Sequence, residues 1–153
     1  MAEIKSNGVV QTVNLNVRSN FLIKNSELLE IAINSSKAQF SLGVRNMLAN
    51  KKVNGIKIDI NTLTSPTNKF NAGQKDETAL YYGFLTIQDT GGVVRIKDLA
   101  LNSLRAGQGF EPISIEPMKI NFEKSYISFT KIPMDAGNNP YVDAVILLEF
   151  YYE

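Results

Sequence analysis

Two acidic pairs are the side chains of this chain whose types could do chemistry. Glu111 and Glu116 lie close together in the sequence, and so do Asp76 and Glu77. Two carboxyl groups, one acting as general acid and the other as base or nucleophile, are the usual equipment for cleaving a glycosidic bond. Each pair lies in or beside a loop-like stretch, where solvated carboxylates are common. We therefore interpret them as surface acids, and a sugar-cleaving enzyme is the least favoured class of function.

Three polar stretches resemble ligand loops without matching their requirements. The Gly-x-Gly of residues 107–110 is followed by Pro112 and a strand-like pattern, whereas a phosphate-binding loop must open a helix. Residues 74–78 and 88–92 offer oxygen ligands that suit calcium, but they lack the alternating acids of a dedicated calcium loop. We expect neither a cofactor nor a metal ion.

The composition excludes several kinds of chemistry. The chain has no His, no Cys and no Trp, and its formal net charge is +1. Disulfides and thiol nucleophiles are therefore excluded, and the commonest zinc ligands and the usual general base are missing. A nearly balanced charge does not indicate a basic surface that would bind nucleic acid or anionic lipid. We expect a protein that is not an enzyme.

Alternating apolar residues predict β-strands along most of the chain. Asn54-Gly55 is a turn signal before one such segment. Residues 79–97 read as a hairpin that turns at 89–92. The predicted strand segments are 9–17, 37–44, 55–60, 79–88, 93–97, 112–116, 118–123, 125–132 and 144–153.

The last of these segments, 144–153, is the most apolar. Its alternate positions from Ala144 to Tyr152 form one face without a polar residue, and the other face is apolar only in its first half. This pattern is typical of a central strand between two layers. Its neighbours would lie in the same sandwich or in an adjoining copy.

Two regions carry helix signals. Residues 26–50 fit either strands or a short helix with Ser26 as N-cap, and the sequence leaves both possibilities open. Residues 98–107 predict a short helix, with Asp98 as N-cap, Leu101 and Leu104 on one face, and Gly107 beyond its end.

These segments together predict a mainly β, two-sheet antiparallel sandwich, jelly-roll-like, with one or two short helices. Roughly eight or nine short strands at about ten-residue spacing favour this architecture. We expect a single domain over residues 1–153, with residues 1–8 as a candidate extended arm.

The best candidates for contact between subunits are residues 1–8 and the long polar loop of residues 61–78, because long loops in compact domains are usually functional or mobile. The alternative is that Phe70 packs on its own domain and that Tyr81 and Tyr82 are ordinary sandwich residues. The candidate contact residues are Lys69, Phe70, Asn71, Lys75, Tyr81 and Tyr82. Unpaired strand edges are further candidates, since they invite strand addition.

The overall pattern resembles small β-sandwich proteins of bacteriophage particles, such as capsid jelly rolls, head-decoration proteins and tail modules. The resemblance implies a non-enzymatic structural component that assembles with its own copies and with other virion proteins, in a capsid, vertex, decoration or tail role. It carries over no catalytic residue. The alternative is a carbohydrate- or protein-binding sandwich module, in which Phe70, Tyr81 or Tyr82 would provide the stacking surface.

The expected location follows from the absence of targeting features. Residues 1–17 lack the continuous apolar core of a signal peptide, and no apolar run is long enough for a transmembrane helix. We expect synthesis in the cytoplasm and a final location in a virus particle.

Overall fold

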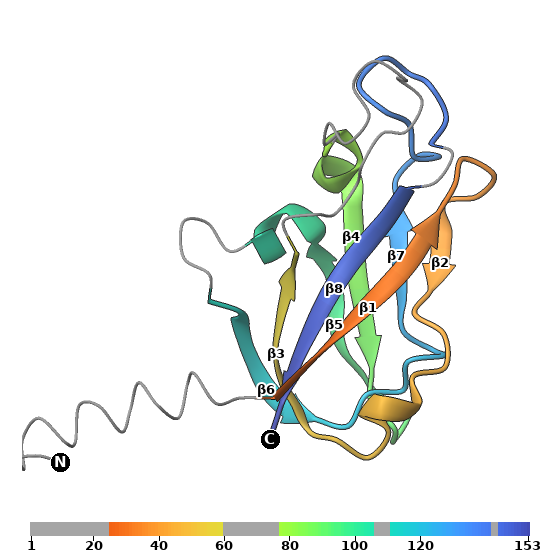
Figure 1. Ribbon diagram of the computed structural model, residues 1–153. Coiled ribbons are helices and arrows are strands. Elements are labelled where there is room, and N and C mark those ends of the chain that lie inside the picture. Colours follow the sequence, from red (N-terminus) through yellow and green to blue (C-terminus); the bar gives the residue numbers. More distant parts are fainter. Residues whose placement is uncertain (1–24, 60–76, 106–110, 142–143) are drawn as a thin grey trace, which may run out of the picture.

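Two antiparallel sheets of four strands each make up the architecture in the computed structural model, which describes residues 25–59, 77–105, 111–141 and 144–153 (Figure 1). The first sheet has the order β1 (Asn25–Ile33), β8 (Ala144–Tyr152), β3 (Val53–Ile58) and β6 (Ile113–Met118). The second has the order β2 (Gln39–Ser41), β7 (Tyr126–Phe129), β4 (Gly83–Gln88) and β5 (Val94–Ala100). Three short 3₁₀ helices are η1 (Asn46–Leu48), η2 (Thr78–Tyr82) and η3 (Leu101–Arg105). The prediction of a mainly β, two-sheet antiparallel sandwich is confirmed.

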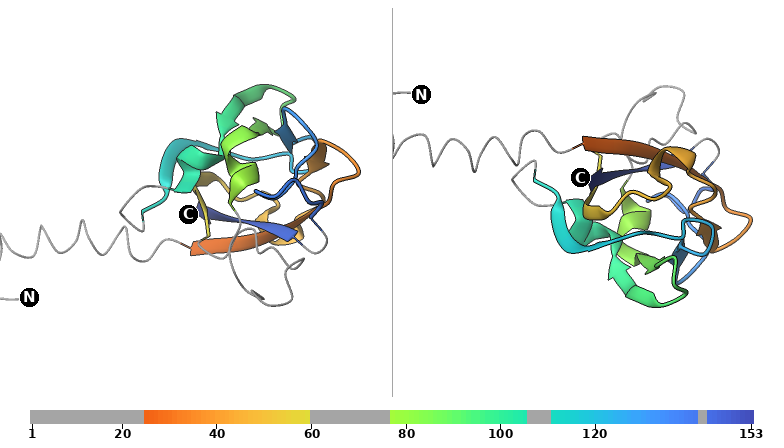
Figure 2. Two further views of the ribbon diagram at one scale, coloured as in Figure 1. Left: turned by 90° about the horizontal axis from the view of Figure 1, so that it is seen from above. Right: turned by 90° about the horizontal axis from the view of Figure 1, so that it is seen from below.

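The strand order is that of a jelly roll. β1 pairs with β8, β2 with β7, β3 with β6 and β4 with β5, so the strands pair from the two ends of the described chain inwards. The further pairs β3 with β8 and β4 with β7 join these ribbons into two sheets. This is a long hairpin rolled into two layers, which Figure 2 shows from above and below.

β8 is the central strand of the first sheet. Leu148 lies opposite Leu29 of β1 on one side and opposite Ile58 of β3 on the other. All three side chains are buried in the layer between the sheets. The other face of β8 is partly covered, since Leu147 is buried and Val145, Glu149 and Tyr151 are intermediate in exposure. The predicted central strand is confirmed, and its neighbours are both in the same chain.

The inward faces of the two sheets form one hydrophobic core. On β1 the side chains alternate strictly, with Leu29, Ile31 and Ile33 buried and their neighbours exposed. Phe122 meets the ring of Phe150 edge-on at 5.3 Å between centroids. Such contacts contribute beyond the burial of area alone, so this end of the core is held by ring geometry as well as by burial.

The segment 26–50, which the sequence left open, is mostly extended. β1 and β2 occupy its first part, and the only helical turn in it is η1. The alternation of Leu29, Ile31 and Ile33 therefore outweighs the N-cap signal of Ser26, whose hydroxyl bonds to a neighbouring strand instead.

The predicted strand 79–88 begins later than expected, because residues 78–82 form η2. Ala79 and Leu80 are both buried while Tyr81 is exposed, which a strand's alternation does not allow. The strand begins at Gly83, where a Cβ would lie 2.6 Å from Leu101 Cδ1 and 2.8 Å from Phe129 Cε1. Only glycine permits this close approach of the sheet to η3.

The short helix predicted over 98–107 begins later than expected, and Asp98 is not its N-cap. β5 continues to Ala100, and among the described residues of this segment Leu101–Arg105 is helical, with Leu101 and Leu104 buried as expected. Asp98 has φ 53° and lies in a bulge, where the pairing shifts between Ile96 and Leu99. Aspartate tolerates this backbone conformation better than most residues, and the Asp98 N–H donates to the buried Thr86 Oγ1 at 3.3 Å.

Two further segments differ from the sequence prediction. Asn54-Gly55 is not a turn before a strand, because both residues lie inside β3 at a bulge. Of the predicted strand 118–123, only Met118 belongs to β6, Ile120 makes an isolated bridge to Asp89, and the next residues turn. The predicted strand 9–17, the arm 1–8 and nearly all of the loop 61–78 lie outside the described residues. In the described ranges, no helix has the length and apolar character needed to cross a membrane.

Adjacent leucines of β1 test the orientation of the strand. Leu29 is buried and Leu28 is 47% exposed. We expect Leu29→Ala to lower the free energy of unfolding by about 2–5 kcal/mol, because it leaves a cavity between the sheets. Leu28→Ala, the matched control, should change it by about 0.5 kcal/mol or less. Urea denaturation at low protein concentration measures both, and equal losses would contradict the assigned faces.

Candidate functional site

The residues of the predicted contact surface are only partly described. Lys69, Phe70, Asn71 and Lys75 lie outside the described residues, so their joint surface stays a prediction. Tyr81 and Tyr82 lie in η2, at the end of the sandwich opposite η1 (Figure 1). Their environments differ sharply, although the residues are adjacent.

Tyr82 holds the neighbouring loop in place. Its hydroxyl donates to the carbonyl of Met134 at 3.1 Å and accepts from the N–H of the same residue at 2.8 Å. Its ring lies edge-on to Phe129, and the ammonium of Lys131 is 4.8 Å from the ring centroid. The side chain is thus committed to contacts within its own chain.

Tyr81, in contrast, is 69% exposed. A single exposed tyrosine offers an aromatic face to a partner, but Tyr82 does not extend that face. The loop after Met134, which Tyr82 holds, is shaped by Asp135. The Oδ1 atom of Asp135 accepts from the backbone N–H groups of Gly137 and Asn139, each at 2.8 Å. A contact surface at this end would therefore rest on Tyr81 and on residues outside the described ranges.

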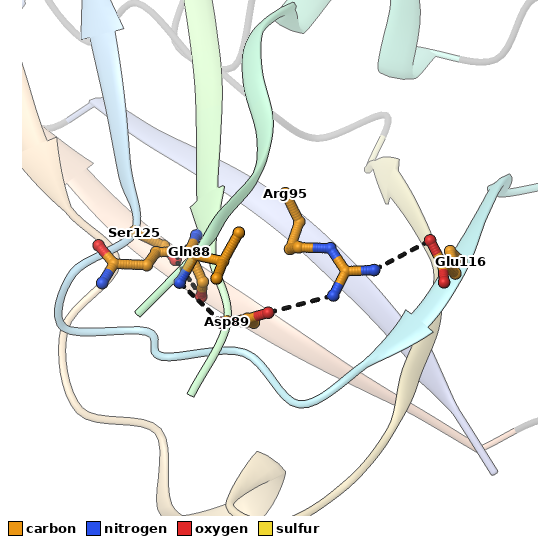
Figure 3. A network of polar contacts seen from close by, with 6 residues as sticks. Gln88, Asp89, Arg95, Glu116 and Ser125 are labelled. Carbon is orange, nitrogen blue, oxygen red and sulfur yellow. Dashed lines mark hydrogen bonds and ion pairs between the residues drawn. The ribbon is translucent and has the colours of Figure 1, made fainter. Parts of the chain in front are cut away.

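Of the acidic residues singled out from the sequence, Asp89, Glu116 and Glu77 are paired with arginines, and Asp76 lies outside the described residues. Arg95 donates to Asp89 Oδ2 at 3.2 Å and to Glu116 Oε2 at 2.9 Å, as Figure 3 shows. Asp89 follows β4 and Glu116 lies on β6, so Arg95 joins the edges of the two sheets. Glu77 is paired with Arg105 at 2.7 Å, and Glu111 is exposed.

The turn around Asp89 is built for structure. The Asp89 carboxylate accepts from the N–H of Val93 at 2.9 Å, and this hydrogen bond, followed by the bonds from Arg95, lowers the pKa of Asp89 below its ordinary value. Beside it, Ser125 Oγ accepts from the N–H of Gln88 at 3.0 Å and donates to the carbonyl of Asn121 at 2.7 Å. Asp89, the one acid of the calcium-like stretch 88–92, thus already has cationic and backbone partners. Within the part of the chain that the structure describes, no group of three or more acidic residues could hold a metal ion.

A groove lies beside β1. It has a volume of about 210 Å³ and is lined by Glu27–Leu29 of β1 and by residues 44–47, which follow β2. Leu28 is 47% exposed, Val44 64% and Met47 66%. Three large apolar side chains therefore gather at one site, whereas single exposed ones are ordinary.

The backbone at this groove is an open sheet edge. Among the strands that the structure describes, β1 is the outermost of its sheet, and the Glu30 carbonyl accepts from Arg45 Nη2 at 3.1 Å on the side away from β8. In an antiparallel strand every second residue directs its N–H and carbonyl to the same side. The polar groups of Leu28 thus also point away from β8, and no hydrogen bond from them to another described residue is found outside the sheet. Arg45 covers the middle of the edge, and its beginning is open.

A polar cluster crosses the outer face of the same sheet. Ser26 Oγ donates to Glu149 Oε1 at 2.7 Å, and Lys57 Nζ lies 3.3 Å from Glu149 Oε2. Partial burial alone would raise the pKa of Glu149, but the hydrogen bonds from Ser26 and Tyr151 and the charge of Lys57 lower it below its usual 4.5. The cluster links β1, β8 and β3 side by side.

Sequence reasoning did not identify Val44 and Met47 as surface residues. Their spacing with Leu48 resembles a helix face, and only the position of η1 beside the edge of β1 shows that Leu48 is buried while Met47 is not. Open strand edges had been anticipated in general, but not which one.

Comparisons with known proteins identify no relative: no protein-family model matches the chain, and neither a curated protein nor a solved structure matches it significantly.

Adjacent tyrosines provide a matched test of the loop anchor. We expect Tyr82→Phe to lower the free energy of unfolding by about 1–3 kcal/mol, because it leaves the N–H and carbonyl of Met134 without their partner. Tyr81→Phe removes the same atom from an exposed ring and should change stability by about 0.5 kcal/mol or less. Denaturant unfolding compares them, and an equal effect of both substitutions would rule out the anchoring role.

The cluster around Glu149 predicts a pH dependence. Because the folded-state pKa of Glu149 is lowered, the stabilisation by its carboxylate is present above pH 4.5. It is lost as the pH falls through the folded-state pKa. We expect Lys57→Met to cost about 1 kcal/mol or less at neutral pH, and this cost to shrink as the pH falls through the lowered pKa of Glu149 and its carboxylate takes up a proton. Lys52→Met is the control. A cost independent of pH would show that Lys57 does not stabilise the charged carboxylate.

Proposed function

We propose that this chain is a non-enzymatic structural component of a virus particle, assembled from many copies through loops and strand edges. The resemblance to bacteriophage virion sandwiches makes a phage particle the specific expectation, and the particle would be the protein's final location. Other structural proteins of the particle would be its further partners.

The observation that carries the proposal is the jelly-roll strand order, β1-β8-β3-β6 and β2-β7-β4-β5. Double-sheet jelly rolls are used repeatedly in viral capsid proteins and also in lectin domains. The support is an analogy of fold, and a fold alone does not determine a function. Features of the surface must decide between assembly and ligand binding.

Those features favour contact between macromolecules. The chain has no His and no Cys, and its net charge is close to zero. The exposed Leu28, Val44 and Met47 gather beside an open strand edge. An apolar patch next to unpaired backbone groups is a site where another chain can add.

The second candidate is a carbohydrate- or protein-binding module. The exposed ring of Tyr81 is the observation in its favour, because an aromatic face can stack on a sugar or a side chain. The commitment of Tyr82 to Met134 reduces the aromatic surface that such a module could use.

The molar mass in solution separates these candidates. We expect the full chain to form a discrete ring, shell or fibre as its concentration rises, seen by light scattering after size-exclusion chromatography and by negative-stain electron microscopy. Tyr81→Ala should leave this assembly unchanged and would abolish binding in a sugar-binding module.

A strict monomer at every concentration would refute the assembly proposal. A monomer that bound immobilised glycans through Tyr81 would establish the binding module in its place.

A further inference from the structure

We propose that the open edge of β1 receives residues 9–17 of a second copy of this chain as an added strand. The inference rests on the proposed self-assembly, which it makes specific by naming the two surfaces that meet. Leu28, Val44 and Met47 form the receiving site, and the apolar face of residues 9–17 is the part that enters.

The receiving site offers both components of strand addition. The backbone groups of Leu28 point away from β8 and supply hydrogen bonds to a new strand. The groove of about 210 Å³ beside them supplies a place for alternate side chains. In strand addition the backbone gives affinity and such pockets give specificity.

The proposed occupant has the matching pattern. Val9, Val13, Leu15 and Val17 share one face of an extended segment, and the other face is mostly Thr and Asn. The part of β1 that can pair is its beginning, before Glu30, whose carbonyl is bound by Arg45. Residues 9–17 carry no charged side chain, so no charge would be buried when their apolar face enters the groove. The alternation of the segment thus matches the receiving site.

The short connection to β1 favours a second copy over the same chain. Residues 18–24 would have to form the loop of a hairpin if 9–17 paired with its own β1. Hairpin loops usually have two to five residues, roughly, and use Gly, Asn or Asp at their turns. This loop would have seven residues, with Asn20 but no Gly or Asp, and would place Phe21, Leu22 and Ile23 in the turn. A parallel pairing within one chain would need about a dozen connecting residues or more, which are not there.

Cysteine cross-linking tests the contact directly, because the chain has no cysteine of its own. A tagged chain carrying Val13→Cys, Leu15→Cys or Val17→Cys is mixed with an untagged chain carrying Met47→Cys and oxidised. We expect a covalent heterodimer with at least one of the three positions, formed about tenfold faster or more than the control, since a disulfide needs Cα atoms within about 7 Å.

The control is an untagged chain carrying Tyr81→Cys, whose side chain is 69% exposed against 66% for Met47, but which lies at the opposite end of the sandwich. Equal rates for Met47 and Tyr81 would overturn the inference. A rapid bridge within one chain carrying both Leu15→Cys and Met47→Cys in dilute solution would also overturn it, by placing the segment on its own edge.

Charge substitutions provide a second, independent measurement on the full chain. Val13→Lys with Leu15→Lys places two charges on the apolar face, and we expect the dissociation constant for self-association to rise by about a hundredfold. Thr12→Lys with Asn14→Lys adds the same charge to the opposite face and should raise it by about threefold or less. Equal effects of the two pairs would refute the proposed orientation.

The two proposals fail in distinguishable ways. A full chain that stays monomeric refutes self-assembly and this inference together. A full chain that assembles normally when it carries Val13→Lys and Leu15→Lys retains the proposed function and refutes only the role of residues 9–17.

Discussion

The docking of β8 between β1 and β3 is the constraint on which the rest of this structure depends. Leu148 lies between Leu29 and Ile58, and these buried side chains close the first sheet over the second. Burial of one large aliphatic side chain contributes about 1.5–3 kcal/mol, so a strand buried on one entire face is held firmly at the end of the chain. The same docking leaves β1 and β6 as the outer strands of the sheet. A firmly held centre thus implies open edges.

The two edges of the first sheet are treated differently. At β6, Glu116 is tied through Arg95 to the other sheet, and a charged group at an edge discourages strand addition. At β1, Arg45 covers the carbonyl of Glu30, and the beginning of the strand remains open beside Leu28 and Met47. The two edges of the first sheet therefore differ in their capacity to add a strand. A head-to-tail contact through one open edge produces rings or open chains, which is the geometry that a repeating assembly uses.

Much of the fold could be predicted from the sequence, because its strands alternate clearly. The apolar face of 144–153 indicated a central strand, and β8 is one. The errors occurred where tertiary contacts decide local structure: Gly83 starts β4 only because Leu101 and Phe129 approach it, and Asp98 occupies a bulge rather than a helix cap. The groove could not be found from sequence, since Val44 and Met47 are distant from Leu28 in the chain and approach it only because the segment after β2 lies beside β1. Tyr82 likewise carries no sequence signal of its bond to Met134.

Amide hydrogen exchange of the full chain, measured at low and high protein concentration, tests most directly whether a closed centre and an open edge coexist. The account predicts that amides of β8 exchange slowly at both concentrations, because opening them requires the core to open. The Leu28 amide should exchange rapidly in dilute solution and become protected as copies associate. A Leu28 amide that is already protected in dilute solution, or β8 amides that exchange as fast as it does, would contradict the account.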